Sequence, residues 1–295
     1  MRKRTYYLVA LLACCLTALP SPQALSQGSS EVWKVGILWH AANLQEEKVM
    51  FGPFSEGMRD LGYVEGRNVV YDHTFVNEKY NRFEARAQEL IDRKVDVILA
   101  SVAAAAAVAG KLTKSIPIVF AGSGDPVKLG LVKSLARPGG NVTGLSLFYP
   151  QLTVKHLELL RAVEPGVSRV AILTNPDNPD AAVAQTEAMQ GAAALNIVAI
   201  PIGAKGPEEF ATAFSSIRSA NVNGMIVLGD SMLRINRRPI VAFAAKSRLP
   251  AIYAPRDYVE EGGLIAYGVG IPENFRRSAS YVDKILKGRS LETYL

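Results

Sequence analysis

Cysteine is almost absent from this chain of 295 residues. Its two cysteines, Cys14 and Cys15, both lie in an N-terminal segment with the pattern of a cleavable leader. A chain cut near Ala24 would therefore contain no thiol. This absence excludes a cysteine nucleophile, a disulfide and a thiolate metal site from the exported chain.

Histidine is also scarce, and His40, His73 and His156 are the only three. None has a second histidine at metal-ligand spacing, so the sequence predicts no metal site. The dinucleotide fingerprint and the phosphate-binding loop are missing, and the glycines of a nucleophile elbow are missing around Ser123. We therefore expect no cofactor and no enzymatic activity.

A massed positive charge is the third absence. The formal net charge of +6 includes Arg2, Lys3 and Arg4 of the leader, so the rest of the chain carries 6 − 3 = +3. A nucleic-acid site needs basic residues gathered on one face with aromatic residues among them. Here Lys and Arg are scattered among Asp and Glu. We predict a solvated surface and no nucleic-acid partner.

Residues 1–27 have the features of a secretory signal peptide. A basic start is followed by an apolar run from Tyr6 to Leu19 and then by prolines and small residues around Ala24. The run is too short to span a bilayer comfortably, so the first interpretation is cleavage and a periplasmic or other extracytoplasmic location. Lipid attachment at Cys14, in "LLAC", is the second interpretation.

From Val32 onward, short apolar runs alternate with amphipathic stretches. The runs are typical of buried strands, and stretches such as residues 46–63 have helical spacing of their apolar residues. The alternation begins again after "RPGGNVTGLS", which we interpret as a break, and it includes one long helix expected over residues 232–248. This order predicts an α/β fold with two doubly wound parallel-sheet lobes.

The two halves of this pattern define the expected domains. Lobe 1 covers residues 31–146, and lobe 2 covers residues 147–270. Residues 271–295 are expected to return to lobe 1, and glycines near the break suggest a hinge between the lobes.

Ligands of open parallel sheets bind beyond the carboxyl ends of the strands, where loops and helix N-termini meet. The candidate ligand-binding residues at these ends are Trp39, His40, Ser101, Val102, Ala103, Gly122, Ser123, Asp125, Asn175, Asp230, Ser231 and Tyr253.

Three roles are expected within this set. Ser101 precedes a helix whose first turn contains only alanines, so its free amides favour a carboxylate. Asp125 or Asp230 could accept a hydrogen bond from an amino group, although either could instead cap a helix. Trp39 and Tyr253 could flank a side chain, although Trp39 could equally belong to the core.

Several blocks of the chain resemble a known family. They are "PIVFAGSGDPVKLGLVKSLARPGGNVTGLS", "RVAILTNPDNPDA", "RLPAIYAPRDYVEEGGLIAYG" and "FRRSASYVDKILKG". These blocks resemble bacterial extracytoplasmic solute-binding proteins of ABC importers, of the TrpX-like, aromatic amino-acid-binding type. The resemblance implies the type I periplasmic-binding fold, in which two hinged lobes close on a small solute. It also implies a further strand and helix after Gly288, where this chain has "RSLETYL".

The favoured function is capture of a small carboxylate-bearing solute, an amino acid or a relative, for an ABC permease. We expect the protein to act as a monomer. An exported ligand-sensing protein of the same fold is the alternative. A two-lobed enzyme ranks third, since the common cofactor-free amino-acid racemases need a pair of cysteines.

Export is the first testable prediction. Cell fractionation should find the protein outside the cytoplasm, shortened by roughly 24 to 28 residues, because the leader should be removed on translocation. N-terminal sequencing of the purified protein would locate the cut. A full-length product in the cytoplasm would contradict the prediction.

Overall fold

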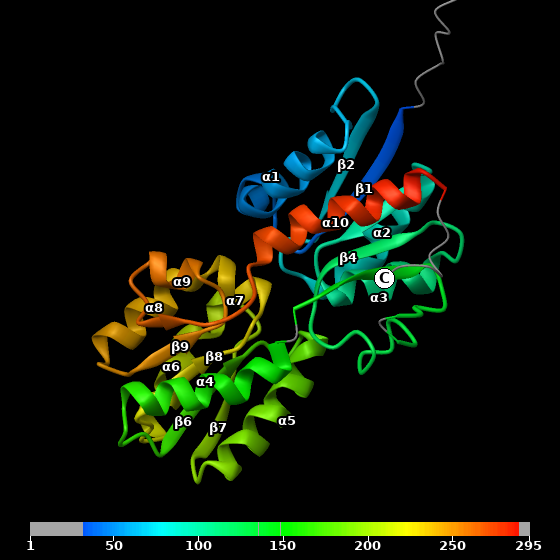
Figure 1. The fold of residues 1–295 in the computed structure, drawn as a ribbon. Coiled ribbons are helices and arrows are strands. Elements are labelled where there is room, and N and C mark those ends of the chain that lie inside the picture. Colours follow the sequence, from blue (N-terminus) through cyan, green and yellow to red (C-terminus); the bar gives the residue numbers. More distant parts are fainter. Residues whose placement is uncertain (1–31, 135, 148, 289–295) are drawn as a thin grey trace, which may run out of the picture. The chain divides into compact units, whose positions relative to one another are not determined.

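The computed structural model describes residues 32–134, 136–147 and 149–288 (Figure 1). The predicted leader, with Cys14, and the C-terminal "RSLETYL" lie outside the described residues. The described chain contains two parallel sheets of five strands each, with helices on both faces. The predicted α/β fold with two doubly wound lobes is therefore confirmed. Within the described residues, no helix has the length and apolar character needed to cross a membrane.

The first sheet has the spatial order β2-β1-β3-β4-β5. Its strands are β1 (Trp33–Trp39), β2 (Val69–Phe75), β3 (Val97–Ala100), β4 (Ile118–Ser123) and β5 (Val142–Ser146). Helices α1 (Leu44–Asp60) and α10 (Ile271–Leu286) pack on one face, while α2 (Phe83–Asp92) and α3 (Ala103–Leu112) pack on the other (Figure 1). A single 3₁₀ turn, η1 (Tyr80–Arg82), precedes α2. Strand β1 is buried from Val35 onward because it lies between two strands and two helical layers.

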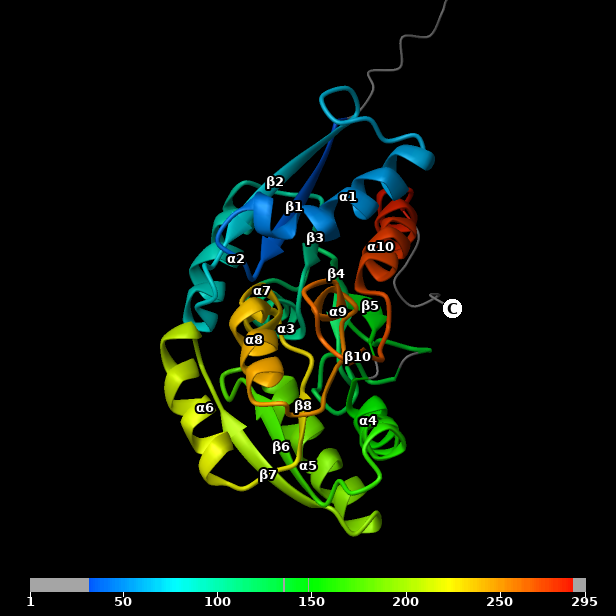
Figure 2. The same ribbon diagram turned by 90° about the vertical axis from the view of Figure 1, so that its left-hand side faces the viewer.

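The second sheet has the order β10-β9-β8-β6-β7. Its strands are β6 (Arg169–Thr174), β7 (Val198–Gly203), β8 (Gly224–Val227), β9 (Ala251–Tyr253) and β10 (Ile265–Ala266). Helices α4 (Tyr149–Val163) and α5 (Pro179–Ala194) pack on one face, and α6 (Phe210–Ser219) and α8 (Arg237–Lys246) pack on the other (Figure 2). The short elements are η2 (Pro207–Glu209), α7 (Ser231–Ile235) and α9 (Asp257–Glu260). Counted within its own lobe, each sheet has the order 2-1-3-4-5, so one arrangement occurs twice.

The chain passes between the two sheets after β5, where it enters α4, and again through residues 267–270, which lead into α10. Helix α10 packs against α1 and the first sheet. These two connecting segments lie close to the carboxyl ends of the strands.

Two local predictions need correction. The segment "RPGGNVTGLS", expected to be a break, contains β5, the edge strand of the first sheet. The single helix expected over residues 232–248 is two helices, α7 and α8. They separate at Asn236, whose ψ of 31° leaves the helical range and whose side-chain amide donates to the carbonyl of Met232.

Gly144 in β5 pairs with Phe120 of β4 and leaves no room for a side chain. Its φ is +154°, and an ideal Cβ at this position would lie 2.1 Å from the carbonyl oxygen of Phe120. A side chain would therefore push β5 away from β4. Glycine allows the two backbones to meet.

Gly144→Ala should lower the free energy of unfolding by about 3 kcal/mol, because the added methyl group overlaps backbone atoms that cannot move aside. Gly140→Ala is the matched control, since a Cβ there meets no heavy atom within 4 Å. Urea unfolding of both variants measures the difference. Equal stability of the two variants would contradict the close approach of β5 and β4.

Candidate functional site

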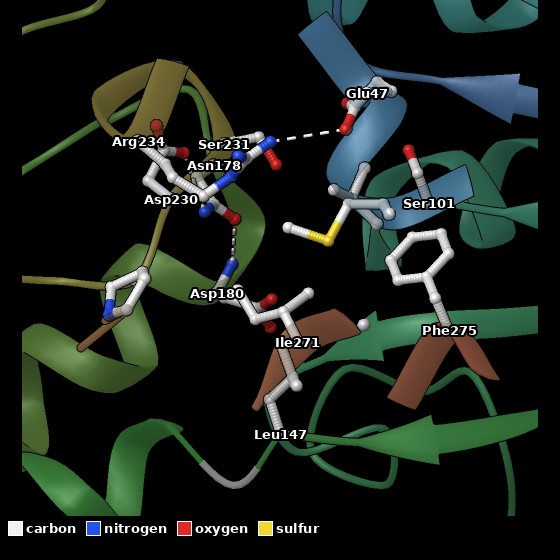
Figure 3. Close-up of a pocket in the computed structure, with 15 residues that line it drawn as sticks. Glu47, Ser101, Leu147, Asn178, Asp180, Asp230, Ser231, Arg234, Ile271 and Phe275 are labelled. Atoms are coloured by element: carbon white, nitrogen blue, oxygen red, sulfur yellow. Dashed lines mark hydrogen bonds and ion pairs between the residues drawn. The ribbon is translucent and has the colours of Figure 1, made fainter. Parts of the chain in front are cut away.

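A cavity of about 60 Å³ lies where the carboxyl ends of the two sheets face each other (Figure 3). Strand ends of both lobes contribute to its wall, and α1, α5, α7 and α10 contribute side chains. Its lining residues are Glu47, Met50, Ser101, Val102, Gly122, Leu147, Asn178, Asp180, Gly229, Asp230, Ser231, Arg234, Pro255, Ile271 and Phe275.

A buried ion pair crosses from one lobe to the other at this cavity. The guanidinium of Arg234, in α7, lies 3.2 Å from the carboxylate of Glu47, in α1, and neither side chain is more than 7% exposed (Figure 3). Burial raises the pKa of Glu47, and the charge of Arg234 acts in the opposite direction. A second carboxylate, that of Asp257, lies 3.4 Å from the same guanidinium.

Further polar contacts join the lobes around this pair. The hydroxyl of Tyr80 donates to Asp230 at 3.3 Å, and the amide of Asn236 donates to Glu78 at 3.1 Å. Lys128 of the first lobe lies 2.7 Å from Glu187 of α5. The lobes are therefore closed on each other in this structure.

Asp230 caps α7 and has its hydrogen-bonding capacity filled. One carboxylate oxygen accepts from the backbone N–H of Leu233 at 2.9 Å. The other accepts from the amides of Asn178 at 2.9 Å and Asn175 at 3.2 Å, and from the hydroxyl of Tyr80. Burial raises the pKa of Asp230, and these donors oppose the rise.

Asp180 differs from Asp230 although both line the same cavity. It lies in the first turn of α5, where its backbone N–H donates to the side chain of Asn178, the helix cap. Its carboxylate accepts from the backbone N–H of Gly124 in the other lobe at 3.2 Å. It has no ion-pair partner within the described part of the chain. Burial raises the pKa of Asp180 to about 6, because the charged carboxylate is poorly solvated. A positively charged group beside it would favour the charged form, and no described side chain supplies one.

The N-terminus of α3 lies at the same cavity. Val102 is its N-cap residue, no side chain caps the helix, and Ser101 and Val102 both line the cavity. The first amides of a helix have no acceptor inside that helix and carry a partial positive charge. Of the predicted residues, Ser101, Val102, Gly122, Asp230 and Ser231 therefore meet at one place.

The structure places the other predicted residues elsewhere. Trp39 is buried in the first lobe, where its ring stacks on Phe275 at 5.6 Å and its N–H donates to His73 at 2.9 Å. Tyr253 is buried in the second lobe and stacks on Tyr258 at 4.6 Å. Strands with two buried faces carry no alternation that would show which residue points toward the cavity.

Asp125, Asn175, Ala103 and Ser123 complete the predicted set. Asp125 accepts from the backbone N–H groups of Val127 and Lys128, so it braces its own turn. The side-chain amide of Asn175 donates to Asp230, and Ala103 is buried in α3. Ser123 ends β4, and its side chain lies outside the described part of the structure.

Sequence reasoning missed Glu47, Asp180 and Arg234, which carry charge into the cavity. All three lie within helices rather than at strand ends. The available signal for Asp180 was its position after "NPDNP", where the chain turns from a strand into a helix. Among the described residues, no group of three or more His, Cys, Asp and Glu side chains is arranged to hold a metal ion.

Comparisons with known proteins give a consistent picture. The model of a family described as ABC transporter substrate binding protein matches residues 42–293. A tyrosine-binding protein of Clostridioides difficile (strain R20291) is 27% identical over 240 residues, which is 81% of this chain and 68% of that protein.

Two solved structures show the fold in two states. A Streptococcus chain in complex with L-Trp has a TM-score of 0.80 at 21% identity, covering 90% of this chain and 88% of that one. The ligand-free, open structure of a substrate-binding protein from Clostridium difficile has a TM-score of 0.64 at 25% identity, covering 89% of this chain and 88% of that one.

His40 directly follows β1, and its backbone N–H donates to the hydroxyl of Ser101 in the cavity wall. Its ring is fully buried against Tyr80, at 4.8 Å between ring centroids, and against Phe83, at 6.1 Å. Neither ring nitrogen has a hydrogen-bond partner within the described residues. Burial, and then the charge of Arg234, lowers the pKa of His40 to about 4.

This shift predicts a loss of stability in acid. Because the folded-state pKa lies below the unfolded value of about 6.5, the unfolded chain binds the proton first as the pH falls. The loss should begin near pH 6.5 and reach on the order of 3 kcal/mol by pH 4, since one pKa unit corresponds to ~1.4 kcal/mol.

His40→Phe tests this prediction, because a phenyl ring fills the site without titrating. The difference in free energy of unfolding between the variant and the wild type should shift in favour of the variant between pH 8 and pH 4. Contributions of the unchanged carboxylates and histidines cancel in that difference. A constant difference across this range would show that His40 is not the group responsible.

Proposed function

The chain belongs to the family of ABC transporter substrate-binding proteins, and we propose that its solute is an α-amino acid held between the two lobes. Proteins of this family bind solutes outside the cytoplasm for import, and they are not enzymes. The predicted solute-binding role is therefore confirmed at the level of the family.

The single observation that carries the amino-acid assignment is Asp180. A half-buried carboxylate with one backbone donor and a raised pKa is stabilised by an ammonium group, which supplies both charge and hydrogen bonds. The other carboxylates of the cavity are already occupied, since Glu47 pairs with Arg234 and Asp230 has its own donors.

The carboxylate of the same solute is assigned to the N-terminus of α3. Ser101 adds a hydroxyl there, although that hydroxyl already accepts from the backbone N–H of His40 at 3.2 Å. An acceptor for the ammonium in one lobe and donors for the carboxylate in the other match the two charges of an α-amino acid. Binding then joins the lobes through the solute itself.

The relatives indicate which amino acids to examine first. One is named for tyrosine binding, and a structural neighbour was solved with L-Trp. L-tyrosine is therefore the first candidate solute. Export through the predicted leader, docking of a monomer onto an ABC permease and delivery of the solute complete the proposed function.

Asp180→Asn should weaken binding of L-tyrosine by about 1.5–3 kcal/mol, because the ammonium loses its charged acceptor while the shape of the site is kept. Isothermal titration calorimetry on the exported protein measures this loss, and the melting temperature should change little. Asp125→Asn is the matched control and should weaken binding much less, since Asp125 accepts from the backbone of its own turn and acts on Asp180 only through its charge.

The affinities of the wild type and the variants for L-tyrosine show whether Asp180 binds the ammonium group. Equal affinity of Asp180→Asn and the wild type for L-tyrosine would overturn the role of Asp180. If L-tyrosine produces no heat with the wild type, and a panel of the other common amino acids gives no thermal shift, the amino-acid assignment itself is wrong.

A further inference from the structure

A second and larger hollow adjoins the cavity. It is a groove of about 860 Å³ formed by α1, α9, the segment leading to β10 and the start of α10. The cavity and the groove share four wall residues, Met50, Arg234, Pro255 and Ile271. The two spaces therefore adjoin at these residues.

The groove is lined by apolar side chains that solvent reaches. Val49 is 56% exposed, Val259 is 40% exposed and Leu264 is 57% exposed, and all three line it. Exposed apolar side chains that gather in one groove mark a place where a ligand or partner is bound. The charged residues Arg256 and Glu260 extend into solvent at its edge.

The volume of the cavity limits what it can hold. It measures about 60 Å³, whereas the groove beside it measures about 860 Å³. The charged and polar groups that an amino-acid head group needs line the smaller space. A long side chain bound together with that head group therefore extends beyond the cavity.

The shared wall offers a path for that side chain. Met50 is unbranched and flexible, so a small rotation can open the space beside it, whereas Arg234 is fixed by two carboxylates. An apolar chain that leaves the cavity beside Met50 and Ile271 enters the groove directly.

We propose that the groove is the binding site for the side chain of the solute, and that the protein selects amino acids with long apolar side chains. This inference rests on the proposed function, because it requires the amino-acid head group in the cavity. Because the groove adjoins the cavity, a solute bound in the cavity can reach the groove directly, which favours the solute as the occupant. Binding of a separate protein segment would not require a wall shared with the cavity.

The test uses a series of amino acids that differ only in chain length. L-2-aminobutyrate, L-norleucine and L-2-aminooctanoate are titrated calorimetrically into the exported protein. Each methylene that enters the groove should tighten binding about fourfold, the factor that corresponds to ~0.8 kcal/mol per buried CH₂. Affinity should therefore rise across the whole series.

Val259→Asp places a charge in the groove away from the cavity. It should weaken binding of L-2-aminooctanoate at least tenfold and leave L-2-aminobutyrate unchanged. Val127→Asp is the matched control, because Val127 is 42% exposed and lines neither space, and it should leave both affinities unchanged.

The outcomes distinguish this proposal from the proposed function. If affinity is highest for the shortest member and falls along the series, the groove does not hold the side chain. Equal effects of Val259→Asp and Val127→Asp on L-2-aminooctanoate would overturn it as well. If neither L-tyrosine nor any member of the series binds, the proposed function fails, and the groove assignment fails with it.

Discussion

The buried pair of Glu47 and Arg234 is the interaction on which the site depends. Removing a charge from water costs several kcal/mol unless a partner and further hydrogen bonds replace the solvent. Each of these residues comes from a different lobe, so the two charges meet only when the lobes meet. Asp257 holds Arg234 from its own lobe. Such a pair is weak evidence of net stability, but its geometry defines one register in which the closed lobes meet.

This register decides which carboxylate is left for a solute. Asp180 and Asp230 are the same residue type in the same cavity, yet Asp230 receives three side-chain donors in addition to its helix amide, while Asp180 receives a single amide from the opposite lobe. Burial acts on both, but only Asp180 keeps capacity for a new donor. A cavity with several acidic residues thus presents one of them to an ammonium group.

The sequence was sufficient for the order of strands and helices, because apolar runs and helical spacing are local properties. The strand-end rule also located Ser101, Gly122 and Asp230, since it follows from the geometry of parallel sheets. It could not locate Glu47 or Arg234, which lie inside helices and reach the cavity only once the lobes are packed. Nor could it place Trp39, because a strand buried on both faces gives no sign of which face a residue takes.

The division of the site follows from how the fold makes it. The polar groups for a head group come from strand ends and helix termini, whose backbone positions are set by two sheets of identical order. The walls of the groove come largely from the segment of residues 254–273, which includes the short α9 and the second passage between lobes. Outside β10 and the start of α10, exposed side chains of this segment can change without disturbing either sheet. The residues that bind the head group are therefore fixed by the fold. The residues that select the side chain can differ along the segment that joins the lobes without a change of fold.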